Sequence, residues 1–256
     1  MSRRLAYALA RQMPGALLGL LVALTLTASG TAHAGAGVAP QRICTSGRYK
    51  AAAAYGACAE KALAKEELTG LGTPFGDKFV KAIGGCLKKY GAAWTKLQKK
   101  NEGTHDDCDA PRVVNNQDGT VTDNLTGLQW EKKTDDSSAH DKDNTFTWSA
   151  TSIAATGTVF TSFLGALNTG LFAGHADWRL PTVVEALTIL LEPPPCVTSP
   201  CIDQTLFGPS NAAQYWTDTT TLDNIQRAWC VYAADGSAGD HAKTFTFAAR
   251  AVRGGL

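Results

Sequence analysis

Two patterns of hydrophobic positions divide this chain. Up to about residue 100, apolar residues recur at steps of three, four or seven, which is the period of amphipathic helices. From about residue 111 onward, short apolar runs alternate with turn-forming residues, which predicts strands. We therefore expect an α+β protein in which a helical part precedes a part rich in strands.

The helical part contains two expected helices joined by a turn. The first has its apolar positions at Cys44, Ala51, Tyr55, Cys58 and Ala62. The second has them at Phe79, Ile83, Cys86, Tyr90, Trp94 and Leu97. Residues 69–76 hold three glycines and a proline, so the chain is expected to turn there. Two helices with a short connection pack antiparallel, which predicts a helical hairpin over residues 35–110.

Four cysteines indicate how this hairpin is cross-linked. In an antiparallel hairpin, facing residues have a nearly constant sum of residue numbers. That sum is 144 for Cys58 with Cys86 and 152 for Cys44 with Cys108, whereas the other pairings join opposite ends of the hairpin. We predict these two nested disulfides, which would stabilise a unit too small to bury much apolar surface.

Three further cysteines lie in the strand-rich part. Cys196 and Cys201 enclose a short loop and are predicted to form a local disulfide. Cys230 is then left over, either as a buried free thiol on a strand, which we favour, or as a link to a second chain. The sequence has no Cys-x-x-Cys pair, which argues against a zinc ribbon and a thioredoxin-type site.

The strand-rich part carries clear turn signals. Its expected strands cover residues 113–114, 120–122, 128–131, 215–218, 227–232 and 243–253. Asp118-Gly119 is the hairpin signal between the first two strands. Alternation in the third strand directs Leu128 and Trp130 to one face.

Two helices are expected among these strands. One lies within residues 145–168 and begins around Trp148. The other starts at Thr182, which forms a capping box with Glu185, and it ends before Pro193.

Just before that second helix stands the chain's densest group of distinctive residues. It consists of Asp177, Trp178, Arg179, Leu180, Pro181 and Thr182. Trp178 and Leu180 are expected to fill the core, and Asp177 is expected to pair with Arg179. We interpret the stretch as a structural element and not as a ligand-binding site.

The N-terminal residues have the pattern of a signal peptide. Three arginines precede an apolar run over residues 16–28, and Ala32-His33-Ala34 matches a cleavage site. We expect residues 1–34 to be removed and the mature chain to be periplasmic, cell-surface or secreted, a setting in which disulfides persist. An uncleaved membrane anchor is the alternative, although the apolar run is short for a bilayer span.

Charge is unevenly distributed along the chain. Residues 35–110 carry 12 basic and 8 acidic side chains, whereas residues 111–256 carry 9 and 15. The overall formal charge of +1 is not that of a nucleic-acid-binding protein.

The second helix of the hairpin, whose apolar positions run from Phe79 to Leu97, is rich in lysine. A docking face for an anionic surface, such as lipopolysaccharide or an acidic polymer, is one interpretation. A solvated helix face is the interpretation that we favour. Gly84-Gly85 weakens this helix, and a close approach of the two helices beside Cys86 would account for it.

Six ordered blocks in residues 111–256 resemble one known family. They are Asp118–Asn124 together with Thr126–Trp130 as the first block, then Thr147–Ala150, Asp177–Thr182, Tyr215-Trp216, Ala228-Trp229 and Val252–Gly254. In this order they are similar to the C-terminal domain of the Legionella collagen-like (Lcl) protein family. The resemblance implies a C-type-lectin-like fold with two helices, a twisted mixed sheet and long loops. It also implies export, and for some members glycan binding or adhesion, and it brings no catalytic motif. Relatives often have cysteine where Ala251 stands.

A binding module is the function that we expect. Candidate ligand-binding residues are Trp216, Asp218, Asp223, Asn224 and Trp229. Aromatic rings can stack on sugars and polar groups can fix hydroxyls, although both tryptophans could equally be core residues. The ligand would be a glycan or a surface protein. We expect no cofactor and no metal. Calcium is the alternative that we do not favour, since Asp118, Asp123 and Asn124 fit turns better than a calcium loop.

Two other function classes are weaker. An enzyme would need a nucleophile, base and orienting group, and no known catalytic motif is present in the sequence. Sulfatase-modifying enzymes, which generate formylglycine, have a related fold but need a cysteine arrangement that this chain does not obviously provide. A purely structural envelope protein is the second alternative.

Overall fold

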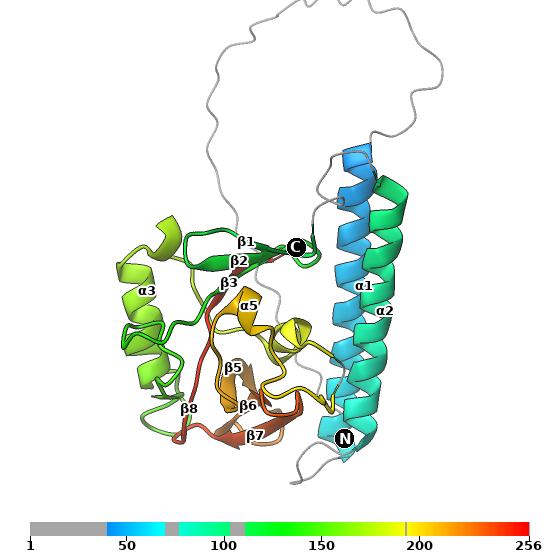
Figure 1. The fold of residues 1–256 in the computed structure, drawn as a ribbon. Coiled ribbons are helices and arrows are strands. Elements are labelled where there is room, and N and C mark those ends of the chain that lie inside the picture. Colours follow the sequence, from blue (N-terminus) through cyan, green and yellow to red (C-terminus); the bar gives the residue numbers. More distant parts are fainter. Residues whose placement is uncertain (1–39, 70–76, 103–110, 193, 256) are drawn as a thin grey trace, which may run out of the picture. The chain divides into compact units, whose positions relative to one another are not determined.

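The computed structural model describes residues 40–69, 77–102, 111–192 and 194–255 (Figure 1). The expected signal peptide, residues 1–34, lies outside the described residues. Among the described helices, none combines the length and the apolarity that a membrane span requires.

The first two described elements are long helices, α1 (Pro40–Thr69) and α2 (Asp77–Asn101), which lie side by side (Figure 1). Cys58 and Cys86 form a disulfide with a Cα–Cα distance of 5.8 Å. The rings of Tyr55 and Tyr90 are 4.7 Å apart, at nearly the same residue-number sum as the disulfide. The predicted antiparallel hairpin and its inner disulfide are therefore confirmed. Cys44 is disulfide-bonded, but its predicted partner Cys108 lies outside the described residues.

The proposed reason for Gly84-Gly85 is wrong for Gly85. A Cβ atom added to Gly85 would have no neighbour within 4 Å. The helices instead approach closely at Gly47, where an added Cβ would lie 2.2 Å from a methyl carbon of Leu97.

Among the described residues, three antiparallel sheets follow the hairpin. The four-stranded sheet has the order β1 (Val113–Asn115), β2 (Thr120–Asp123), β3 (Leu128–Glu131) and β9 (Val252–Gly254). The three-stranded sheet contains β5 (Gln214–Thr220), β6 (Arg227–Tyr232) and β7 (Ala238–Ala242). A small sheet pairs β4 (Phe146–Thr147) with β8 (Thr246–Phe247). The predicted α+β class is confirmed.

Short helices connect these sheets. They are the π-helix η1 (Val159–Leu164), α3 (Gly165–Thr169), the 3-10 helix η2 (Phe172–Gly174), α4 (Val183–Ala186), the 3-10 helix η3 (Leu187–Ile189) and α5 (Gln204–Phe207). Leu128 and Trp130 of β3 are both buried, as their alternation predicts. The Asp118 carboxylate accepts a hydrogen bond from the Thr120 backbone N–H, which is turn chemistry.

Two element predictions need correction. The helix expected to begin around Trp148 begins only at Val159, and β4 precedes it. A Cβ at Gly157 would lie 2.2 Å from the Thr147 carbonyl, so the chain folds back on itself where the helix was expected. The single strand expected over residues 243–253 is divided, because Ala248 bridges β5 while Val252 pairs with β3.

The stretch 177–182 has the structural role that its sequence predicts. Trp178 and Leu180 are 3% and 1% exposed. The Asn168 side chain donates to the Trp178 carbonyl and accepts from its N–H, and the Trp178 indole N–H donates to the Phe172 carbonyl at 3.0 Å. Thr182 closes the capping box of α4.

The expected pairing of Asp177 with Arg179 is wrong. Arg179 donates to both carboxylate oxygens of Glu185 at 2.7 Å, and Asp177 accepts from Arg253 at 2.7 Å. The capping box already fixes the Glu185 carboxylate beside Arg179, and β9 brings Arg253 to Asp177.

We predict that Trp178→Ala destabilises the domain by about 3–5 kcal/mol, because it leaves a large cavity in the core. Denaturant unfolding followed by tryptophan fluorescence measures this loss. Val197→Ala is the control, since Val197 is 92% exposed and its truncation is expected to change stability by less than about 0.5 kcal/mol. Equal stability of Trp178→Ala and the control would contradict the structural role.

We predict that replacing both Cys58 and Cys86 with alanine lowers hairpin stability by about 3–4 kcal/mol, because the disulfide closes a 28-residue separation. Loss of helical circular dichroism on heating measures the effect. Cys230→Ala is the control, since Cys230 is a free thiol. Unchanged melting of the double variant would show that packing alone holds the hairpin.

Candidate functional site

The structure divides the five candidate ligand-binding residues into two groups. Trp216 is fully buried and its indole N–H donates to the Phe146 carbonyl at 2.8 Å, and Trp229 is 5% exposed. Both tryptophans are thus core residues, the alternative role that the sequence allowed. Asp218, Asp223 and Asn224 are exposed, and their role in binding stays a prediction.

A groove of about 720 Å³ lies elsewhere in the strand-rich part. Its uncharged polar lining consists of Asn115, Gln117, Thr134 and Gln204. Its charged lining consists of Lys132, Lys133, Asp135 and His140. Phe172 contributes a large apolar ring. The volume is in the usual range for small-ligand sites, and a few polar groups around apolar surface are typical of them.

Phe172 is held in place by a strained turn. Its neighbours Leu171 and Ala173 both have positive φ values, 51° and 50°, which cost non-glycine residues about 1–3 kcal/mol each. The Phe172 ring lies 4.2 Å from the His140 ring and 5.0 Å from the Trp178 ring, measured between centroids. A Cβ at Gly119 would come within 3.1 Å of it. Strain of this kind is typically retained at functional sites.

A buried charged centre lies beneath the groove. The Glu131 carboxylate is fully buried and contacts Lys133 Nζ at 3.0 Å and His140 Nδ1 at 2.9 Å. Its second oxygen accepts from the Ala251 N–H at 2.9 Å. Burial raises the pKa of Glu131, but the charge of Lys133 and the bond to His140 outweigh it, so its pKa lies below the ordinary value of 4.5. Burial lowers the pKa of Lys133, and Glu131 opposes that shift.

His140 therefore has one ring nitrogen held by the protein and one left available to a ligand. Its Nδ1 is held by Glu131, whereas Nε2 has no hydrogen-bond partner among the described residues. The imidazole can use Nε2 to contact a ligand in the groove.

This arrangement suits binding better than covalent catalysis. The groove lining contains no serine or cysteine, and the Thr134 hydroxyl already donates to Asp136 at 2.7 Å. A nucleophile paired with a base is therefore not assembled within this described site.

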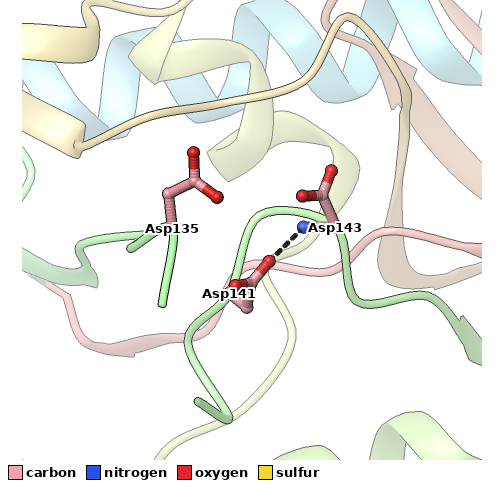
Figure 2. A group of neighbouring side chains, drawn as sticks. All are labelled: Asp135, Asp141 and Asp143. Carbon is pink, nitrogen blue, oxygen red and sulfur yellow. Dashed lines mark hydrogen bonds between the residues drawn. The ribbon is translucent and has the colours of Figure 1, made fainter. Parts of the chain in front are cut away.

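Three carboxylates beside the groove form an acidic cluster (Figure 2). Asp141 accepts from the backbone N–H groups of Asp136, Ser137 and Asp143. Lys142 Nζ pairs with Asp135 at 2.9 Å and with Asp143 at 2.7 Å. All three carboxylates thus have protein partners, which accounts for the cluster as a structural turn.

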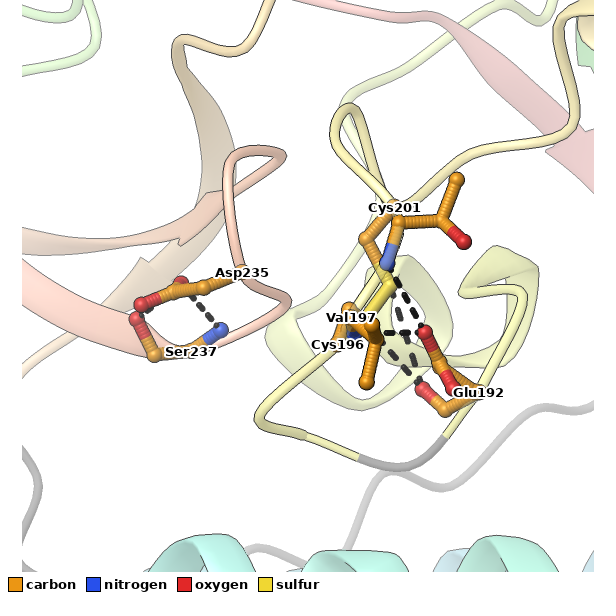
Figure 3. The surroundings of a disulfide bond; sticks show 7 residues. Glu192, Cys196, Val197, Cys201, Asp235 and Ser237 are labelled. Carbon is orange, nitrogen blue, oxygen red and sulfur yellow. Dashed lines mark hydrogen bonds between the residues drawn. A yellow bond between two sulfur atoms is a disulfide. The ribbon is translucent and has the colours of Figure 1, made fainter.

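The predicted disulfide between Cys196 and Cys201 is present, with a Cα–Cα distance of 5.9 Å (Figure 3). The Glu192 carboxylate accepts from the Val197 N–H at 2.6 Å, which fixes the loop that the disulfide closes. Cys230 is a buried free thiol as predicted, and burial raises its pKa.

Sequence reasoning did not identify His140 and Phe172 as site residues. His140 lies in an Asp- and Ser-rich turn, and Phe172 lies in a short apolar run, and neither matches a motif. The one indication in the sequence is position, because Leu171–Gly174 lies just before the structural stretch 177–182.

We predict that Glu131→Gln flattens the acid dependence of stability. Ionised Glu131 has a lowered folded pKa, so its stabilising contribution is complete above about pH 4.5 and is lost as the pH falls through the folded pKa. Between about pH 5 and pH 3, the free energy of unfolding measured in urea is expected to fall more for the natural chain than for the variant.

The matched control is Asp223→Asn, which changes an exposed carboxylate. If Glu131→Gln does not fold, Glu131→Gln with Lys133→Met removes both buried charges and allows the same comparison. Parallel pH profiles for the natural chain and the Glu131 variants would contradict the assignment.

Comparison with known families finds a match that covers most of the groove lining. The family described as the Lcl C-terminal domain matches residues 119–253. This range contains the groove from Gly119 onward, together with the 177–182 stretch, and leaves the helical hairpin outside it. No curated protein matches the chain. Because the match covers more than half of the sequence, the chain belongs to the Lcl C-terminal domain family.

Proposed function

We propose that this chain is an exported, non-catalytic binding protein whose Lcl C-terminal domain holds a glycan in the groove at His140 and Phe172. The observation that carries this proposal is the strained turn that holds Phe172 among hydroxyl and amide groups. Membership of the family supports a non-catalytic protein of the extracellular type.

The groove has the chemistry that sugar recognition needs. The Phe172 ring can contact the apolar C–H face of a sugar ring. The amides of Asn115, Gln117 and Gln204 offer both donors and acceptors to hydroxyl groups. His140 Nε2 adds a further polar contact whose direction is set by Glu131.

Charges in the groove favour a neutral or weakly acidic sugar. Lys133 is buried against Glu131, and Asp135 pairs with Lys142, so these charges are largely compensated. Lys132 forms no ion pair with any described residue and can attract one carboxylate of a ligand. The acidic balance of residues 111–256 disfavours a strongly sulfated ligand at this domain.

Export and adhesion belong to the same proposal. The signal-peptide pattern and the disulfides fit an oxidising compartment at or beyond the cell envelope. A C-type-lectin-like fold, implied by the family resemblance, would suit this role. A structural envelope protein without a small ligand is the competing function.

We predict that Phe172→Ala weakens glycan binding by about tenfold, because about 1–1.5 kcal/mol of ring stacking is lost. A glycan array probed with residues 35–256, with and without a calcium chelator, identifies the ligand. Calorimetry then measures the affinities of the variants.

Phe172 also packs against Trp178, so Phe172→Ala can change folding as well as binding. Gln117→Gly is therefore a second variant, which removes an amide from the groove. Gln117 has a φ of 63°, so glycine relieves strain while removing the amide, and folding is retained. The control is Leu222→Ala, an exposed residue outside the groove. Absence of any glycan ligand would favour the structural function, and release of a hydrolysed product would favour an enzyme.

A further inference from the structure

Helix α2 presents a face of exposed lysines. The exposed lysines are Lys81, Lys88, Lys89, Lys96, Lys99 and Lys100. No acidic residue lies between Asp77 and Asn101 to compensate them. None of the six forms an ion pair with another residue in the described part of the chain.

The lysines form two rows along the helix. At about 100° per residue, Lys81, Lys88 and Lys99 fall within about 20° of one another. The second row, which consists of Lys89, Lys96 and Lys100, lies about 60–100° from Lys81.

Small residues separate the two rows. Gly85 and Ala92 fall at about 40° and 20°, between the rows, and both are exposed. Glycine inside a helix costs about 1 kcal/mol relative to alanine, and at Gly85 no packing contact accounts for that cost. The two residues form a shallow floor flanked by ammonium groups.

The orientation of this face is fixed by the hairpin. Ile83, Tyr90 and Trp94 are buried on the opposite side of α2, and Cys86 is cross-linked to α1. The lysines therefore stay in solvent along about 29 Å of helix, from Lys81 to Lys100.

We propose that this lysine face binds an extended acidic polysaccharide, with its anionic groups alternating between the two lysine rows and its backbone over Gly85 and Ala92. This site lies outside the matched family domain and is independent of the groove. Lysine is a compact charge without fixed hydrogen-bond geometry, so carboxylate and sulfate groups both fit it.

Two other anionic partners fit the face less well. No large apolar side chain is exposed on the described part of α2, whereas helices that lie in a lipid surface insert such residues. Single-stranded nucleic acids are bound through aromatic stacking, and the lysine face has no aromatic ring. A floor between two rows of lysines suits an extended polysaccharide better than a flat lipid surface.

Binding of residues 35–256 to immobilised polysaccharides tests the proposal. The probes are polygalacturonate for carboxylate, dextran sulfate for sulfate, and neutral dextran. Double-stranded DNA and vesicles of phosphatidylcholine with phosphatidylglycerol are the competing partners. We expect binding to one or both acidic polysaccharides, none to dextran, and a steep loss of affinity as salt rises.

Lys88→Gln with Lys96→Gln removes one charge from each row and is expected to weaken this binding roughly tenfold. Lys50→Gln with Lys61→Gln is the matched control, because it removes two exposed charges from α1. Ala92→Leu fills the floor without changing charge and is expected to weaken binding about fivefold or more.

Three results would overturn the proposal. They are failure to bind either acidic polysaccharide, equal losses for the α2 pair and the α1 pair, and tighter binding to DNA or vesicles. Unchanged binding of Ala92→Leu would overturn the placement of the polysaccharide on the floor.

Discussion

The strand-rich part depends on one buried carboxylate, that of Glu131. Its two oxygens contact Lys133, His140 and the Ala251 N–H, and its backbone carbonyl accepts from Arg250. Removing one partner of such a buried pair typically costs about 3–5 kcal/mol. The same contacts join β3 to the C-terminal segment and set the orientation of His140, so a requirement of the core also determines one wall of the groove.

The second wall of the groove is determined by strain. Phe172 lies between two non-glycine residues with positive φ, and its carbonyl is held by the Trp178 indole. Asn168 fixes the Trp178 backbone from α3. The stretch most distinctive in the sequence therefore acts on the groove indirectly, because it holds the turn that presents Phe172.

Local signals were sufficient for the hairpin and for several strands. The steps of three and four residues defined α1 and α2, and the constant residue-number sum identified the Cys58–Cys86 disulfide. Asp118-Gly119 marked the first β-turn, and Thr182 marked the start of α4. These features depend on neighbouring residues or on simple antiparallel geometry, so the sequence alone determined them.

Only the tertiary structure decided the partners of charged residues and the place of the groove. Arg179 pairs with Glu185 instead of Asp177, because the helix cap fixes that carboxylate beside it. Trp216 lies in the core, where its position in the three-stranded sheet directs it. His140 and Phe172 are 32 residues apart and meet through long-range packing. The sequence determined the hairpin, several strands and the lysine-rich helix, whereas the groove required contacts that no local pattern encodes.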